Sequence, residues 1–267
     1  GMQKCKESGK TIFIDLDDDF LNIPRSHPGY KITGPGDKKA IQRLRTALSM
    51  ADHLVTPSPI IAERYAEFVG SNYIVPNNWW SGNNFWLKPA QNRRTINIGW
   101  AGTITHQKDF RPIVPVLESI VKKHDNAMII IGGDPKVFNF LEKIPDHQKM
   151  FLPMVPHEDY PFMLSNFDIL LAPLENNKFN QAKSDIKLLE AGIRSIPWVA
   201  SPLPAYEEWA KGGLLAETAE DWEMAIESLL NDKEKRKALG AEGHEKALTR
   251  ESKHIAEHWL EILRELE

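Results

Sequence analysis

Cysteine is almost absent from the sequence, since Cys5 is the only one among 267 residues. A single cysteine excludes a disulfide within the chain and a cysteine-built zinc site, and it fits a reducing compartment. No apolar run approaches the roughly 18 residues that cross a membrane as a helix. We therefore expect a cytoplasmic protein, with any peripheral association with a membrane made through partners.

The sequence also lacks an excess of positive charge. Lys and Arg number 33 against 37 Asp and Glu, which gives a net charge of -4. Proteins that bind nucleic acid usually carry a basic patch or stripe, and no dense cluster of that kind is present here. Internal repeats and low-complexity tracts are absent as well. We therefore expect no nucleic-acid partner.

What the sequence does contain is an alternation of short apolar runs and amphipathic segments. Runs such as "TIFID", "NYIVP", "TINIGW" and "AMIIIGG" are almost continuously apolar, as parallel strands buried on both faces are. Helical patterns between them predict an α/β fold with a doubly wound parallel sheet. Residues 92–267 hold enough strands for a complete Rossmann-like domain. Residues 1–91 hold about three strands and most of the linker at 77–94, and we expect an incomplete Rossmann-like half there.

Four acids, Asp15, Asp17, Asp18 and Asp19, follow the first apolar run. One interpretation is the nucleophile and magnesium site of a haloacid-dehalogenase-type phosphatase, but the fifth position of that motif is Asp19 here, and only Asp134 offers a later acid. A second interpretation is a solvated edge of the sheet. A third is a substrate-facing role, because ligands of open α/β sheets bind at the carboxyl ends of the strands.

Two later segments contain residues suited to a phosphate-bearing ligand. In "INIGWAGTITHQKDF" the small residues Gly102 and Thr103 follow a strand, where backbone N–H groups can approach a phosphate. In "AKSDIKLLEAGI" we expect a helix near 184–194 with Ser184 at its N-cap. Lys183, Lys187 and Glu190 share one face if that helix extends back to Lys183. The alternative for this segment is an ordinary surface helix.

Together these segments resemble the C-terminal domain of GT-B glycosyltransferases, in particular retaining family 4. "IGWAGTITHQKDF" is similar to the family's glycine loop, and "FDILLAPLENNKFNQAKSDIKLLEAGIRSIPWVAS" to its donor-binding core in the branch with an "FN-x-x-KS" signature. "FIDLDDDFLNIP", "LVTPSPIIAERY" and "YIVPNNWW" resemble pieces of the partner domain. The resemblance implies a GT-B-like fold and transfer of a sugar from a nucleoside diphosphate sugar, as in polysaccharide biosynthesis.

The resemblance also implies roles for particular residues. Glu190 would bind the ribose hydroxyls, and Lys183 would stabilise the charge of the leaving diphosphate. His106 and Asp17 are further catalytic candidates, although a solvated loop histidine is the alternative for His106. The donor-binding residues that the resemblance implies are Gly102, Thr103, Met154, Val155, Lys183, Ser184, Lys187 and Glu190. The implied reaction retains configuration and needs no metal or other cofactor.

The sequence departs from the family pattern at two motif positions. The first of two motif glutamates is replaced by Ala182, and a helix-ending glycine is replaced by Ser195. In addition, residues 1–91 resemble only the back half of the family's acceptor domain. Three interpretations are open: a truncated fragment, a short form that a second copy or partner chain completes, or a donor-binding protein without transferase activity. The other expected partners are a nucleotide-sugar donor and a glycan or lipid-linked acceptor.

Two other features bear on the organisation of the chain. Trp79, Trp80 and Trp86 form an exposed cluster whose rings could stack on sugars, but we expect them instead to pack at a domain junction, with another subunit as a further partner. The final segment "HIAEHWLEILREL" predicts an amphipathic helix that crosses back to the N-terminal part, as chains of the GT-B family do. Because of the short N-terminal part, the alternative function is a non-catalytic nucleotide-sugar-binding or assembly module.

Overall fold

The computed structural model describes residues 1–83, 86 and 94–266, which group into two compact units. The first unit contains residues 1–78, 176–184 and the chain from residue 253 onward, and the second contains residues 79–175 and 185–252. The predicted domain boundary between residues 91 and 92 lies outside the described residues. Within the described ranges, no helix is both long enough and apolar enough to cross a membrane.

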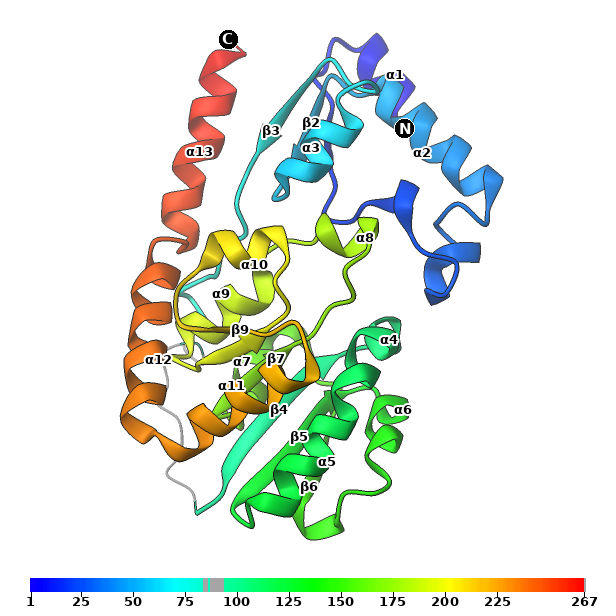
Figure 1. Ribbon diagram of the computed structural model, residues 1–267. Helices are drawn as coiled ribbons and strands as arrows, with labels where there is room; N and C mark the ends of the chain where they lie inside the picture. Colours follow the sequence, from blue (N-terminus) through cyan, green and yellow to red (C-terminus); the bar gives the residue numbers. More distant parts are fainter. Residues whose placement is uncertain (84–85, 87–93, 267) are drawn as a thin grey trace. The chain divides into compact units, whose positions relative to one another are not determined.

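The second unit is built on a six-stranded parallel sheet with the order β6-β5-β4-β7-β8-β9 (Figure 1). The chain moves outward from β4 to one edge and then returns to β7 on the other side, which is the doubly wound topology expected from the sequence. The strands are β4 (Ile96–Gly102), β5 (Ala127–Gly133), β6 (Lys149–Pro153), β7 (Ile169–Ala172), β8 (Trp198–Ala200) and β9 (Gly213–Leu215).

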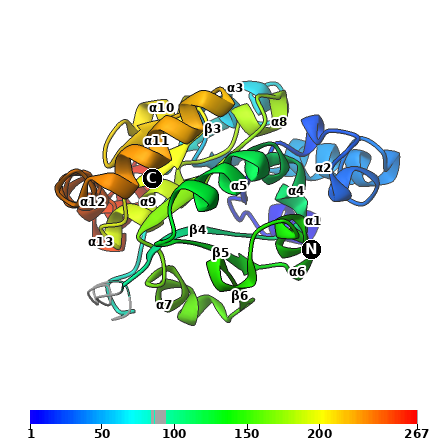
Figure 2. The same cartoon turned by 60° about the horizontal axis from the view of Figure 1, so that its bottom comes forward.

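Helices cover both faces of this sheet, because successive residues of its strands point to opposite sides. Ile129 and Ile131 of β5 pack with α5 and α11, whereas Ile130 packs with α7 and α9. Figure 2 shows α5 and α7 on opposite sides of the strands. The helices are α4 (Gln107–Phe110), α5 (Val114–Lys123), α6 (Pro135–Phe138), α7 (Tyr160–Leu164), α9 (Ile186–Ile193), α10 (Pro204–Trp209), α11 (Ala219–Asn231) and α12 (Lys233–Leu248), with 3-10 turns at Ile104–His106, Arg111–Ile113, Asn139–Leu141, Asp146–Gln148 and His157–Asp159.

The first unit has a smaller parallel sheet with the order β1-β2-β3. Its three strands are the number expected for the N-terminal half. Asp37 caps α2 through the N–H groups of Lys39 and Ala40, and Ser58 caps α3, which begins at Pro59. The elements are α1 (Met2–Glu7), β1 (Phe13–Asp15), α2 (Lys38–Met50), β2 (His53–Thr56), α3 (Pro59–Tyr65), β3 (Ser71–Ile74), α8 (Lys178–Gln181) and α13 (Ser252–Glu265), with 3-10 turns at Phe20–Asn22 and Pro28–Lys31.

Segments distant in the sequence complete the core of the first unit. Ala182, which follows α8, is 1% exposed and packs with Leu48, Leu54 and Tyr65. Helix α13 runs beside β3 (Figure 1) and packs its apolar face on the sheet, with Ile255 and Ile262 next to Val55 and Val75. The final helix therefore returns to the N-terminal part of the chain.

The tryptophans at 79, 80 and 86 do not form one exposed cluster. Trp79 and Trp86 are 5% and 6% exposed in a core of the second unit, and only Trp80, at 66%, is exposed. The indole N–H of Trp79 donates to the carbonyl of Ala247 at 2.8 Å, and Arg194 donates to the carbonyl of Trp86 at 3.0 Å. The description of the three as one exposed cluster is therefore wrong for Trp79 and Trp86, and their packing at a domain junction stays a prediction. Their aromatic area stabilises the second unit itself.

Candidate functional site

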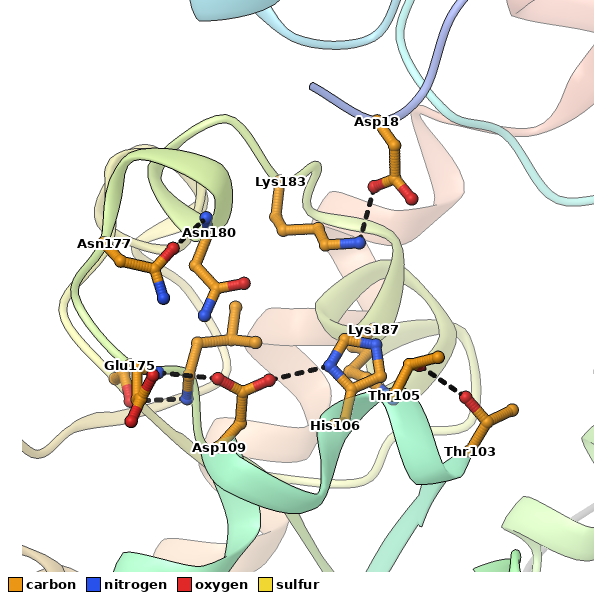
Figure 3. A network of polar contacts seen from close by, with 12 residues as sticks. Asp18, Thr103, Thr105, His106, Asp109, Glu175, Asn177, Asn180, Lys183 and Lys187 are labelled. Atoms are coloured by element: carbon orange, nitrogen blue, oxygen red, sulfur yellow. Dashed lines mark hydrogen bonds and ion pairs between the residues drawn. The ribbon is translucent and has the colours of Figure 1, made fainter. Parts of the chain in front are cut away.

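The carboxyl end of β4 is kept open by small residues. Gly102 ends the strand, and a side chain at this position would meet the ring of Trp100 at 2.7 Å. Next to it, Gly133 has a φ of +109°, and a Cβ there would lie 2.2 Å from the carbonyl oxygen of Gly102. Glycine is needed at both positions, because only a residue without Cβ allows these close approaches. Thr103 follows, and its hydroxyl lies 2.6 Å from that of Thr105 (Figure 3).

His106 lies one short turn beyond this edge and is held by Asp109. Its Nδ1 atom lies 2.9 Å from one carboxylate oxygen of Asp109, and the other oxygen accepts the backbone N–H of Glu175 at 2.9 Å (Figure 3). Asp109 is 8% exposed. The carboxylate therefore fixes the position of the imidazole, which remains partly exposed, and the catalytic role of His106 stays a prediction.

Lys187 brings a positive charge to the same edge of the sheet. Its ammonium group donates to the carbonyl of Ala101 at 2.6 Å and lies 5.9 Å from the ring centre of Trp100. Lys187 is on α9, whereas Ala101 precedes Gly102 on β4. The second unit thus gathers Gly102, Thr103, His106 and Lys187 at the carboxyl end of one strand, which is where open α/β sheets bind ligands.

Glu190 follows Lys187 by three residues on α9 and is half-buried. Desolvation raises the pKa of its carboxyl group to about 7, although the nearby ammonium of Lys187 and a hydrogen bond with Tyr160 both act to lower it. Burial likewise raises the pKa of the Tyr160 phenol well above its ordinary value. A carboxylate held in a desolvated place can accept hydrogen bonds from ligand hydroxyls that replace the lost water.

Helix α9 begins later than the sequence suggested. It starts at Ile186 with Asp185 at the N-cap position, so the expectation that Ser184 caps it was wrong. Lys183 consequently does not share a helical face with Lys187 and Glu190. The reason is that residues 176–184 fold with the first unit: the backbone turns at Ala182, which is buried in that core.

Within the first unit Lys183 forms an ion pair with Asp18, with 2.5 Å between Nζ and the carboxylate oxygen (Figure 3). Its ammonium also lies 4.6 Å from the ring centre of Phe179. The Lys183 and Asp18 side chains are 21% and 32% exposed. Lys183 therefore has a structural partner in the first unit, and its catalytic role and the donor-binding role of Ser184 stay predictions.

The four acids at and after the end of β1 differ in burial and partners. Asp19 is fully buried, where it accepts hydrogen bonds from Arg64 at 2.6 Å and from the Tyr65 hydroxyl at 3.1 Å. Arg64 also donates to the carbonyl of Lys178 at 2.7 Å. A solvated edge is thus the wrong interpretation for Asp19, whereas Asp18 is partly exposed and paired with Lys183. Asp15 and Asp17 are exposed and line a pocket of the first unit.

Met154 and Val155 follow β6, at the carboxyl edge of the second unit's sheet. Met154 is 65% exposed, whereas Val155 packs against the core under α7 and α9. In the part of the chain that the structure describes, no group of three or more His, Cys, Asp or Glu side chains is arranged to hold a metal ion.

Sequence reasoning did not select Asp109 or Tyr160 as site residues. Asp109 could have been found, because it lies three positions after His106 and the two share a helical face. Tyr160 had no local signal, since it is distant in the sequence from Glu190. Only the packing of α7 and α9 on one face of the sheet brings those two side chains together.

The comparisons with known proteins agree with this geometry. The family described as glycosyl transferases group 1 matches residues 95–232, slightly more than half of the chain. The chain belongs to this family. The sequence-based prediction of a glycosyltransferase with a GT-B-like α/β fold is therefore confirmed at the level of family and fold. No curated protein matches the chain.

Several solved structures share the fold. HepE from Anabaena, solved with UDP and glucose, has a TM-score of 0.73 at 14% identity, over 99% of this chain and 74% of HepE. TarM from S. aureus, in a mutant form solved with UDP and saccharides, has a TM-score of 0.70 at 15% identity, over 94% of this chain and 50% of TarM. Sucrose-phosphate synthase from Thermosynechococcus elongatus has a TM-score of 0.69 at 17% identity, over 89% of this chain and 64% of the synthase.

Proposed function

We propose that the protein transfers a sugar from a nucleoside diphosphate sugar to a glycan or lipid-linked acceptor, in polysaccharide biosynthesis. The observation that carries the proposal is that Lys187 and Glu190 lie three residues apart on α9. Both lie in the second unit, and the ammonium of Lys187 reaches the end of β4 beside Gly102. An ammonium group suits a diphosphate, and a carboxylate suits the paired hydroxyls of a ribose.

In this proposal Lys187 stabilises the negative charge that develops on the leaving diphosphate. Positive charges and hydrogen-bond donors that are already in place stabilise the negative charge that develops in the transition state. Removing a single such donor lowers the rate about 10²–10³-fold. Gly102 and Thr103 allow the phosphates to approach the backbone, and Met154 and Val155 border the base. His106, oriented by Asp109, faces the reacting sugar. Because Lys187 supplies the positive charge, we propose that no metal ion is required.

The finer assignments rest on the resemblance to retaining family 4. We propose retention of configuration and, because HepE and TarM were solved with UDP, a uridine nucleotide as the first donor to test. A shortened N-terminal domain, a partner chain or second copy that completes it, and attachment to a membrane through partners stay predictions.

Binding of UDP, GDP, dTDP, CMP and ADP to the full chain, measured by calorimetry with EDTA present, tests the donor site. Lys187→Met and Glu190→Ala should each weaken binding of the preferred nucleotide at least tenfold, which is about 1.4 kcal/mol. Lys122→Met, on the exposed side of α5, is the matched control and should bind as the wild type does. Binding that survives both site changes would contradict the proposed site.

Turnover separates a transferase from a binding module. Hydrolysis or transfer of the matching nucleotide sugar should be measurable with wild type and reduced about 10²-fold or more in Lys187→Met. Tight nucleotide binding without release of sugar, on a panel of saccharide acceptors, would favour the non-catalytic module instead.

A further inference from the structure

The first unit contains a pocket of about 410 Å³ at the carboxyl end of its sheet. Side chains from four parts of the chain line it. Asp15 ends β1 and Asp17 follows it, whereas Asn77 and Asn78 come after β3. Trp259 comes from α13, and Val55, Pro57, Val75 and Pro76 complete the lining. A volume of this size is within the range of small-molecule sites, which hold about 300–1,000 Å³.

The polar part of the lining can form hydrogen bonds with several hydroxyl groups at once. Carboxylates only accept, and each carboxamide both donates and accepts. This lining therefore suits a ligand whose neighbouring groups can both donate and accept hydrogen bonds. The residues concerned are Asp15 and Asp17 on one side and Asn77 and Asn78 on the other. A hydroxyl group is such a group, because it donates one hydrogen bond and accepts others.

The apolar part of the lining argues for an organic ring and against a bare cation. Trp259 is held by α13, whose Ile255 and Ile262 are buried on the sheet, and its ring lies edge-on to Phe13 at 6.0 Å between centres. An indole fixed in this way offers a flat apolar surface, as do the prolines. Cation sites are instead formed by oxygen ligands around a small central space.

The charge of the lining restricts the ligand further. None of the described lining residues is basic, and two are acidic. Burial and the neighbouring Asp17 raise the pKa of the Asp15 carboxyl group above its ordinary range. An anionic ligand brought into the pocket would be repelled by the Asp17 carboxylate and by the ionised form of Asp15, so phosphates and uronic acids do not fit.

We propose that this pocket binds one sugar ring without negative charge, as a subsite for the acceptor. The proposal rests on the proposed glycosyltransferase function, which makes a saccharide the second substrate. The ring hydroxyls bond with the carboxylates and carboxamides, and an apolar face of the ring lies against Trp259. The acceptor class that follows is a neutral or amino sugar, with acidic glycans excluded at this position.

Saturation-transfer NMR on the full chain without nucleotide tests the subsite directly. The probes are the methyl glycosides of glucose, galactose, mannose and glucosamine, with methyl glucuronide as the anionic comparison. At least one neutral or amino glycoside should receive saturation, and the signal should fall at least fivefold in Asp17→Ala and in Trp259→Leu. Methyl glucuronide should give no signal. EDTA should leave the neutral signal unchanged.

Two control variants keep the result interpretable. Asp125→Ala removes an exposed carboxylate of the second unit and should bind the glycosides as the wild type does. Trp259→Phe preserves an aromatic ring if the leucine variant does not fold, and it should keep part of the signal. Equal signals from the glucuronide and the neutral glycosides, signals unaffected by Asp17→Ala, or binding that requires a divalent cation would each overturn the proposal.

The same samples distinguish failure of the subsite from failure of the proposed function. Glu190→Ala should lose nucleotide binding and retain the glycoside signal, because it changes only the second unit. Nucleotide binding and turnover without any glycoside signal would overturn the subsite alone. Glycoside binding in a protein that binds no nucleotide would overturn the proposed function.

Discussion

The two units present opposite chemistry at the same structural edge. Both are parallel sheets, and in both the residues considered for ligand binding follow the carboxyl ends of strands. In the first unit that edge carries Asp15 and Asp17, with carboxamides after β3. In the second it carries Gly102 and a lysine ammonium bonded to the carbonyl of Ala101. One topology can therefore provide an acidic, amide-lined pocket or a place for an anion, depending on a few side chains.

The units also differ in how they use charge internally. The first buries an aspartate completely and pairs it with Arg64, and it pairs Lys183 with Asp18. The second keeps Glu190 desolvated, with a raised pKa, beside Lys187. Charge in the first unit thus contributes mainly to holding distant segments together. In the second unit a charged side chain instead lies at the candidate site, where its desolvation lowers the stability of the folded protein.

The largest expected effect concerns the buried acid of the first unit. Asp19→Ala leaves Arg64 and the Tyr65 hydroxyl without their acceptor, and removing one member of such a buried pair costs about 3 kcal/mol or more. Urea unfolding followed by circular dichroism measures the loss. Asp15→Asn, four positions earlier, is the control and should leave stability unchanged or slightly higher, because burial and Asp17 already disfavour its charged form. Equal losses in the two variants would contradict the separation of roles.

The second expected effect is pH-dependent and belongs to Glu190. Its pKa rises from an ordinary 4.5 to about 7 in the folded protein, so the folded state binds the proton more tightly than the unfolded state. Glu190 therefore leaves the free energy of unfolding unchanged below its ordinary pKa and lowers it as the pH rises from there to about 7. Glu190→Gln removes this penalty and should be more stable than wild type by about 1–3 kcal/mol at pH 8, with a much smaller difference at pH 4.

Because of the same residue, the affinity for the nucleotide should increase with pH, whereas the stability decreases. If the ribose hydroxyls donate to the Glu190 carboxylate, binding of the preferred nucleotide strengthens as the pH rises through about 7 and releases protons. Calorimetry in two buffers of different ionisation enthalpy measures that release. A pH-independent affinity, or proton release that persists in Glu190→Gln, would contradict the assignment.

The fourth prediction separates two roles of Lys183. Lys183→Met and Asp18→Asn both remove the same ion pair, and each should cost under about 1 kcal/mol, because the pair is partly exposed. Only Lys183→Met removes the ammonium group. If Lys183 also holds the donor diphosphate, as we expect, that variant alone weakens nucleotide binding about tenfold, or about 1.4 kcal/mol. Equal affinities in the two variants would leave Lys183 with the ion pair alone.

The smallest expected effect is a gain in stability in the second unit. Among the described residues, Ser195 and Ala210 are the non-glycine residues with positive φ, at 54° and 50°, and both are exposed at helix ends in this unit. Ser195→Gly and Ala210→Gly should each stabilise by about 0.5–1 kcal/mol, because glycine adopts this conformation without strain. Thermal unfolding measures the gain.

A matched glycine substitution with ordinary helical geometry gives the opposite sign. Ala241 is exposed in the interior of α12, and Ala241→Gly should destabilise by about 1 kcal/mol. A loss of stability in all three glycine variants would mean that the positive φ angles carry no strain.

Much of the fold could be predicted from local pattern. The apolar runs became strands, and the alternation with helices gave the doubly wound sheet of the second unit, because parallel strands must be buried on both faces. The final amphipathic helix also carries Ile255 and Ile262 on the face that packs. Gly102, at the end of β4, was recognisable, since close backbone approach needs a residue without Cβ.

The site was harder to predict where residues depend on partners distant in the sequence. The start of α9 was placed too early, because the capping preference of Ser184 is weaker than the burial of Ala182 in the first unit. The partner of Glu190, Tyr160, comes from another helix. Neither the start of α9 nor the contact of Tyr160 with Glu190 can be recognised from residue spacing or composition.

The sequence by itself determined the strand and helix succession, the α/β class, and the chemical types available at each strand end, because periodicity and backbone preference are local. Only the tertiary structure decided which of four neighbouring acids is buried, which lysine is paired, and which carboxyl has a raised pKa. Those outcomes depend on desolvation and on charges brought together from distant segments, and both exist only once the core has formed.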